Sequence, residues 1–511
     1  MIVHDRLYIG GELVEPAGSA TIDVINPFTE EVAGRVPEGT TADVDRAVAA
    51  ARTAFESDWS RMPVAERAEI LGRASQGIQA RMDDLTRLIT TEMGSPYSWC
   101  MFGQVLAPTM VLDYYTELGK TFELEETRPG MFGQVVVRKE PLGVAAAVVP
   151  WNVPLFVTIL KLAPAFLAGC SVVLKPAPET PLSAYDLHEI FAEAGLPPGV
   201  LNIVAAGREV GEHLVTHPGI DKVGFTGSTA AGKRIAALCG ELLRPCTLEL
   251  GGKSAAIVLD DADLAQTVQG IIDGGILNNG QACVAQTRIL ASRSRYDEVV
   301  DALTEAVAAQ VVGDPMDPAT QVGPLVADRQ RDRVLGLIDK GKNEGARVTT
   351  GGGRPAFDRL NELIEGADHR DRALMGHGLH LGLAAHEARE SFDAGDFLVR
   401  TVLGMERASG SVAVGGDVPV GTTVQFHVRD PQTADEQLRS VLADQPGRAA
   451  LVFTGDGRGQ ALFGGPHHDA EVVHEHVDRG ATAGMFCTGE IGPVAGQSFV
   501  HALATALLVF E

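Results

Sequence analysis

Five short runs of small and branched apolar residues recur between residues 144 and 260, and stretches with helical periodicity separate them. Runs of Val, Ile and Ala without polar alternation are typical of strands buried on both faces of a sheet. Strands that alternate with helices form right-handed βαβ units, so this region predicts a parallel sheet with helices on both faces. Ligands of such sheets bind at the carboxyl ends of the strands. The runs cover residues 144–150, 171–176, 200–205, 222–227 and 254–260.

The longest apolar stretch of the chain, residues 143–176, lies in the same region. A membrane-spanning helix is not expected there, because charged, amide and proline side chains interrupt the stretch. Its Val-rich ends fit buried strands on either side of a packed helix. Nearer the N-terminus, a helix is expected to begin at Thr41 or Asp43, because a capping residue there precedes an apolar stripe.

The chain is strongly acidic, with a formal net charge of -25 over 511 residues. Such a surface repels phosphate backbones and anionic lipid head groups, so nucleic acid and membrane partners are disfavoured. The six cysteines include no CxxC pair, which argues against a structural zinc site and a disulfide framework. No basic segment followed by an apolar run is visible at the start, so we expect a cytoplasmic location.

The composition of the chain changes near residue 355. All nine lysines lie at or before Lys342, whereas ten of the fourteen histidines follow residue 360. A glycine-rich stretch at residues 351–355, typical of a turn or linker, lies at the same place. Beyond it, strand–helix alternation gives way to β-type alternation. We place a domain boundary near residue 355, although chance variation within one domain is the alternative.

Two segments carry side chains suited to covalent chemistry. Cys283 follows a polar loop that contains glycine, so its sulfur could be exposed and reactive, although a lone cysteine usually fills a core. Glu249 precedes two glycines, which allow backbone or ligand to approach closely. Beside a thiol this carboxylate could act as a general base, whereas alone it would more often form a surface ion pair.

Two further segments are suited to stabilising negative charge. Asn152 follows a predicted strand, where its amide could donate to a developing oxyanion; a turn-forming role before Pro154 is the simpler alternative. Residues 224–233 combine glycine and hydroxyl side chains between a predicted strand and a predicted helix. The backbone amides of such a loop suit a pyrophosphate, although a glycine-rich turn alone is weak evidence.

In their order and spacing, these four segments together resemble the aldehyde dehydrogenase superfamily. The resemblance covers about residues 5–355. It implies an α/β fold with a Rossmann-like parallel sheet, and an oxidoreductase that converts an aldehyde to a carboxylic acid with NAD or NADP. Further matching text lies in residues 25–37, 175–184, 313–326 and 330–353.

The resemblance implies a role for each chemical residue. Cys283 matches the nucleophile, which attacks the aldehyde carbonyl to form a thiohemiacetal and, after hydride transfer, holds a thioester. Asn152 and the backbone amide of Cys283 match the groups that bind the oxyanion. Glu249 matches the base that activates the hydrolytic water. Lys175, which matches the lysine that holds the adenosine ribose, is also included among the catalytic residues.

The resemblance also implies the contacts of the cofactor. Pro178 stands where members that prefer NAD often carry a ribose-binding glutamate, so NAD and NADP both remain open. No bound metal is implied. The residues expected to bind the cofactor are Trp151, Lys175, Gly207, Gly211, Gly227, Ser228, Gly232, Leu250 and Gln330.

Residues 356–511 lack the segments with which an ordinary aldehyde dehydrogenase continues, including its Glu-Glu-Ile-Phe-Gly-Pro motif and its final strand. They resemble instead the C-terminal module of the FIST family, a proposed intracellular ligand-sensing domain of α+β type. A small ligand is therefore implied, for which Arg458 and Glu490 are candidate contacts. The histidines suggest a metal site, but no partner at tetrahedral spacing supports one: His467, His468, His474 and His476.

We therefore expect a cofactor-binding domain at residues 1–252, a partial catalytic domain with Cys283 at 253–355, and a FIST C-terminal domain at 356–511. Residues near 130–142 match one arm of the family's oligomerisation ribbon, whose usual partner strand is missing. This predicts a weakened homo-oligomer. Two alternatives to the hydrolytic enzyme remain: a ligand-sensing or scaffold fusion with impaired catalysis, and transfer of the thioester to coenzyme A.

We predict that limited proteolysis of the folded chain cuts first near residue 355, because glycine-rich linkers between separate cores are preferred sites of cleavage. Mass spectrometry of the early fragments should place the cut within residues 340–380. A resistant fragment that spans this whole window would contradict the boundary.

Overall fold

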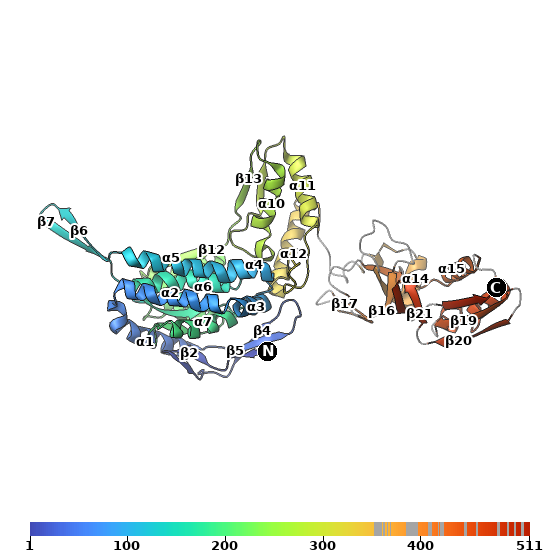
Figure 1. Cartoon of the computed structure of the whole chain (residues 1–511), viewed down its shortest axis with the longest axis horizontal. Helices are drawn as coiled ribbons and strands as arrows, with labels where there is room; N and C mark the ends of the chain where they lie inside the picture. Colours follow the sequence, from blue (N-terminus) through green and yellow to red (C-terminus); the bar gives the residue numbers. More distant parts are fainter. Residues whose placement is uncertain are drawn as a thin grey trace. The chain divides into compact units, whose positions relative to one another are not determined.

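The computed structural model forms two compact units, which divide between Gly351 and Gly352. Figure 1 shows the chain coloured from its N-terminus to its C-terminus. The N-terminal unit is described throughout. The structure describes residues 1–351, 360, 363–364, 366–367, 369–384, 397–406, 411–416, 418, 424–443, 447–455, 458–477, 481–487, 490–494, 497–501 and 505–510.

A seven-stranded sheet forms the centre of the N-terminal unit (Figure 1). Its strands are β2 (Leu7–Ile9), β3 (Glu12–Val14), β8 (Val144–Val148), β9 (Ser171–Lys175), β10 (Leu201–Ile203), β11 (Lys222–Gly227) and β12 (Cys246–Leu250). They lie in the order β12-β11-β8-β9-β10-β2-β3, and the first five run parallel. The antiparallel pair β2 and β3 completes one edge. The predicted parallel sheet is confirmed, and four of the five apolar runs form its strands.

Helices cover both faces of this sheet: α1 (Thr41–Glu56), α2 (Val64–Ala80), α3 (Met82–Met93), α5 (Ala107–Thr121), α6 (Pro154–Ala168), α7 (Leu182–Glu193), α8 (Arg208–Thr216) and α9 (Thr229–Glu241). Successive side chains of a strand point to opposite faces. On β9, Val172 and Leu174 therefore join the core formed with α2, α3, α5, α6 and α7, whereas Val173 joins the core formed with α1, α8 and α9. Burial on both faces explains why the strands lack polar alternation.

Two carboxylates accept hydrogen bonds from backbone N–H groups at the starts of helices. Helix α1 begins at Thr41, as predicted, with a capping box in which the Asp43 carboxylate accepts the Thr40 N–H at 2.8 Å. Glu92, buried at the end of α3, accepts the Leu182 N–H at 2.8 Å at the start of α7. Burial raises the pKa of Glu92 to about 7.

The apolar run at residues 254–260 does not join the large sheet, which corrects the prediction. It forms β13 (Ala255–Val258), which pairs in parallel with β14 (Arg288–Ala291) in a separate two-stranded sheet. An apolar run predicts a strand but not its partner, and β12 already forms that edge of the large sheet. Val258 and Ile271 belong instead to a small core of their own.

The remaining elements of the N-terminal unit include a hairpin of β6 (Glu125–Gly130) and β7 (Gly133–Arg138), which projects from the rest (Figure 1). Its tip is open to solvent, and Phe132 is 98% exposed. Among the described residues of the chain, no helix has the length and apolar character needed to cross a membrane. The other elements are β1 (Ile2–Val3), β4 (Thr21–Ile25), β5 (Val32–Pro37), η1 (Asp58–Arg61), α4 (Tyr97–Trp99), η2 (Cys100–Leu106), α10 (Leu264–Gly275), η3 (Leu277–Gly280), α11 (Tyr296–Ala308) and α12 (Asp328–Asn343).

The described residues of the C-terminal unit form three sheets, of four, three and two strands. Its elements are α14 (His369–His377), β15 (Leu379–Ala384), β16 (Phe397–Glu406), β17 (Ser411–Val414), β18 (Val424–Val428), α15 (Pro431–Ala443), β19 (Ala449–Gly455), α16 (Gln460–Phe463), α17 (His468–His476), β20 (Ala481–Cys487), β21 (Glu490–Val494), β22 (Gln497–His501) and β23 (Thr505–Phe510). Strands β17-β16-β15-β18 form an antiparallel sheet. Strand β19 pairs in parallel with β20 and antiparallel with β23, and α15 and α17 pack on it.

We predict that Gly119→Ala destabilises the N-terminal unit by about 1–3 kcal/mol, because a Cβ on α5 would lie 2.5 Å from the Ala68 Cβ of α2. Gly270→Ala is the matched control, since a Cβ on α10 would meet nothing within 4 Å. That change should stabilise by about 0.5–1 kcal/mol. Thermal unfolding should therefore show shifts of opposite sign, and equal shifts would contradict the packing described.

Candidate active site

Polar side chains hold the loop that carries Cys283. Asn278 and Asn279 adopt left-handed backbone conformations with φ of 54° and 60°, which asparagine tolerates better than most residues. The Asn279 amide donates to the Gly94 carbonyl at 2.7 Å, and its oxygen accepts the Gly323 N–H at 2.6 Å. Segments distant in sequence therefore fix the turn that precedes the cysteine.

Asn152 connects the end of β8 to the same loop. Its Nδ2 donates to the Gln281 carbonyl at 2.6 Å, two residues before Cys283. Its backbone carbonyl accepts hydrogen bonds from Gln104 Nε2 and Asn278 Nδ2, both at 2.9 Å. An amide nitrogen carries two N–H groups, so the bond to Gln281 uses one of them. The structure thus brings Asn152 to the Cys283 loop.

A cavity of about 770 Å³ lies beside this loop, and both Cys283 and Glu249 contribute to its wall. Glu249 reaches it from β12, and the two residues are exposed. A thiol and a carboxylate on one wall can combine nucleophilic attack with proton transfer. Much of the remaining wall is apolar and comes from the segment that includes α6: Val153, Phe156, Val157 and Leu160.

Lys161 lines the same cavity, and sequence reasoning missed it as a site residue. Burial lowers the pKa of its ammonium to about 8, while the charge of Glu249 acts in the opposite direction. A charged side chain within the apolar helix α6 was the available signal. In the sequence, Lys161 counted only as one of the residues that argue against a membrane-spanning helix.

The glycine and hydroxyl loop joins β11 to α9, as predicted. Ser228 caps the helix, and its Oγ accepts the Ala231 N–H at 3.2 Å. A Cβ at Gly232 would lie 2.4 Å from the Leu250 side chain, so glycine allows α9 to approach the sheet closely. Gly227 pairs in register with Leu250. Ser228 and the next two residues are exposed, which leaves the first amides of α9 accessible to a pyrophosphate.

Lys175 ends β9 at the same edge of the sheet. Its side chain is buried, and its Nζ donates to the adjacent Pro176 carbonyl at 3.2 Å. Burial lowers the pKa of the ammonium to about 8. A Cβ at Gly211 would lie 3.1 Å from the lysine side chain, so this glycine of α8 makes room for it. A buried ammonium requires acceptors, and ribose hydroxyls could supply them.

The other expected cofactor residues lie on several elements of the N-terminal unit. Gly207 caps α8, and the Trp151 carbonyl accepts the Thr180 hydroxyl at 3.1 Å. Gln330 is half-buried near the start of α12. Glu179, which follows Pro178, forms an ion pair with the Arg329 side chain of the same helix.

Asp45, His213 and His217 form a group that could hold a metal ion, in a search limited to the residues that the structure describes. The Nε2 atoms of the two histidines lie 2.6 Å and 3.4 Å from Asp45 Oδ1. However, His217 Nδ1 accepts the Gly219 N–H, which leaves the ring proton on the Nε2 that faces Asp45. A metal ion needs that lone pair free, so this geometry favours hydrogen bonding.

The candidate residues of the C-terminal unit differ in their surroundings. Arg458 Nε donates to Asp469 at 2.8 Å. The ring nitrogens of His468 lie 3.0 Å from Asp435 and 3.2 Å from Asp469, within hydrogen-bonding distance of both carboxylates. The side chain of Glu490 lies outside the described residues.

The aldehyde dehydrogenase family model matches residues 13–364, and the chain belongs to this family. It is 47% identical over 360 residues to a geranial dehydrogenase of Castellaniella defragrans, across 70% of this chain and 75% of that protein. An NAD+ complex of an aldehyde dehydrogenase from Bacillus cereus is 39% identical, with a TM-score of 0.66 over 68% of this chain and 72% of that one. An E. coli structure described as an NADP dependent enzyme is 35% identical, with the same TM-score and coverage.

The FIST C domain model matches residues 356–493 and shares residues 356–364 with the first match. The fusion of the two families expected from the sequence is therefore confirmed. The comparisons also confirm the class of enzyme, an aldehyde dehydrogenase, and the class of cofactor, NAD or NADP.

Proposed function

We propose that the chain oxidises an aldehyde to a carboxylic acid with NAD or NADP, with Cys283 as the nucleophile. The observation that carries this proposal is that Cys283 and Glu249 share one cavity, beside a loop that Asn152 holds. The accessible amides at the start of α9 and the buried Lys175 ammonium fit the pyrophosphate and a ribose of a dinucleotide.

In the proposed mechanism, the Cys283 thiolate attacks the carbonyl carbon of the aldehyde. The second N–H of Asn152 and the backbone N–H of Cys283 donate to the resulting oxyanion. A bound NAD or NADP would supply the hydride acceptor, and loss of hydride from the carbon would leave a thioester on Cys283. Glu249 then takes a proton from water, which attacks the thioester and releases the carboxylate and the thiolate.

We further propose that the preferred aldehyde is apolar. The cavity wall formed by Val153, Phe156, Val157 and Leu160 offers few hydrogen-bonding groups, and apolar contacts of this kind favour a hydrocarbon chain. The 47% identity to a geranial dehydrogenase makes geranial a suitable first substrate to test.

Replacement of the nucleophile tests the proposal. We predict that Cys283→Ala lowers NAD(P)-dependent oxidation of geranial by about 1,000-fold or more, because the variant lacks the proposed nucleophile. Cys246→Ala is the control, since Cys246 belongs to β12 and does not line the cavity. Equal activity of both variants would refute the assignment of Cys283. An unaltered protein that binds NAD(P) without turnover would instead favour the non-catalytic alternative.

A second prediction separates the two halves of the reaction. Glu249→Gln should give a burst of reduced cofactor of about one per active site, followed by a slow steady state, because the thioester forms but water is not activated. Rapid-mixing absorbance at 340 nm measures the burst. A parallel experiment with added coenzyme A distinguishes hydrolysis of the thioester from its transfer to a thiol. If it restores turnover in the variant and accelerates the unaltered protein, the acceptor is a thiol and the hydrolytic mechanism is wrong.

A further inference from the structure

The C-terminal unit contains a cavity of about 1070 Å³, bounded by α14, β15, β16, β18 and α15. This volume is slightly above the usual range of small-molecule sites, about 300–1,000 Å³. The wall is rich in arginine and histidine, although the chain as a whole carries a net charge of -25. These residues are Arg370, His380, Arg400, His427, Arg429 and Arg458.

His380 is the feature of this wall that most needs a partner. It is 5% exposed, and neither of its ring nitrogens has a hydrogen-bond partner among the described residues. His427 lies directly opposite on the neighbouring strand, and its buried Nε2 likewise has no partner in the described part of the chain. Buried polar groups are nearly always hydrogen bonded in folded proteins, so these three unpartnered ring nitrogens are suited to contact a bound polar group.

The charges around the two histidines favour an anion. Burial lowers the pKa of His380, and the positive charge of Arg429 lowers it further. Arg400 also lines the cavity from β16. Three carboxylates also line the wall: Asp371, Asp430, which accepts from Arg370 at 2.9 Å, and Glu436, which accepts from Gln432 at 3.1 Å. A negatively charged group in this space would relieve the repulsion among the cations.

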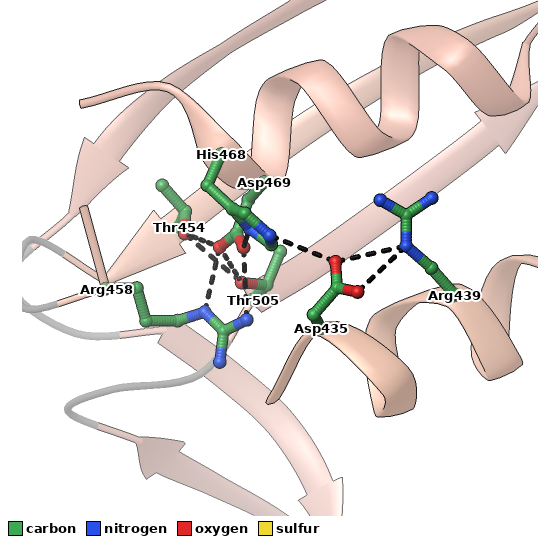
Figure 2. A network of polar contacts seen from close by, with 7 residues as sticks. All are labelled: Asp435, Arg439, Thr454, Arg458, His468, Asp469 and Thr505. Atoms are coloured by element: carbon green, nitrogen blue, oxygen red, sulfur yellow. Dashed lines mark hydrogen bonds and ion pairs between the residues drawn. The ribbon is translucent and has the colours of Figure 1, made fainter. Parts of the chain in front are cut away.

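A second network fixes the position of Arg458 at the edge of the cavity (Figure 2). Its Nε and Nη2 donate to the two carboxylate oxygens of Asp469, at 2.8 Å and 3.1 Å. The same carboxylate accepts hydrogen bonds from Thr454 at 2.6 Å and from Thr505 at 2.8 Å. An arginine held in this way loses little conformational freedom when a ligand arrives, which favours binding.

We propose that this cavity binds a small molecule through an anionic group, a carboxylate or a phosphate, which His380, His427 and Arg400 contact. The site is separate from the Cys283 cavity and does not depend on the proposed aldehyde oxidation. Arg458 serves as a pre-positioned residue at its edge.

Isothermal titration calorimetry of the full chain tests this proposal, with inorganic phosphate and succinate as probes at constant ionic strength. His380→Phe and Arg400→Gln should each weaken binding by about tenfold or more, the value expected for hydrogen bonds to a charged group. Arg448→Gln is the matched control, since Arg448 is an exposed arginine of the same unit that does not line the cavity. Binding of succinate alone would identify a carboxylate site, and binding of phosphate alone a phosphate site.

Thermal unfolding supplies the complementary readout. His380→Phe removes two unsatisfied nitrogens and keeps a planar ring, so the variant should be at least as stable as the unaltered protein while it loses the anion. The loop before α9 can also take phosphate, and the difference between Arg400→Gln and Arg448→Gln isolates the cavity from it. If neither anion binds, or if all variants bind as the unaltered protein does, the proposal is wrong.

Discussion

The hydrogen bond from Asn152 Nδ2 to the Gln281 carbonyl, at 2.6 Å, is the contact on which the candidate active site depends. It joins the carboxyl end of a central strand to a loop that follows it by more than a hundred residues. The strand is rigid because both of its faces are buried. Side-chain amides hold the loop: Asn278 donates to the Asn152 carbonyl, and Asn279 donates to the Gly94 carbonyl. Together with the hydrogen bonds of Asn279 to Gly94 and Gly323, this bond orients the segment that carries Cys283.

Much of the N-terminal fold could be predicted because its strands are buried on both faces. Such strands consist of continuous apolar runs in the sequence. The strands β8, β9 and β11 begin at the predicted residues and end within two residues of the predicted ends. The strand β13 shows the limit of this reasoning. Its composition is that of the others, but strand pairing depends on which edges the rest of the chain leaves open.

The candidate site was predictable to the extent that its residues follow strands directly. Asn152 and Lys175 lie at or just after the carboxyl ends of β8 and β9, where parallel sheets place their ligands. Lys161 and His380 were not predicted as site residues, because what distinguishes each of them is the burial of its side chain. Segments far away in the sequence bury such a side chain, and the local hydrophobic pattern does not predict which segments these are.

Two buried carboxylates, Glu92 and Asp469, respond differently to acid. Burial raises the pKa of Glu92 to about 7, so its contribution to stability is full below its ordinary value of 4.5 and is lost as the pH rises towards 7. At Asp469, burial acts in the same direction, but the hydrogen bonds from Arg458, Thr454 and Thr505 outweigh it and hold the pKa well below its usual range. The contribution of Asp469 is therefore present at neutral pH and is lost only in strong acid. Between pH 7 and 5, acidification strengthens the N-terminal unit through Glu92 and leaves the contribution of Asp469 to the C-terminal unit unchanged, so the tolerance of mild acid is built separately into each half.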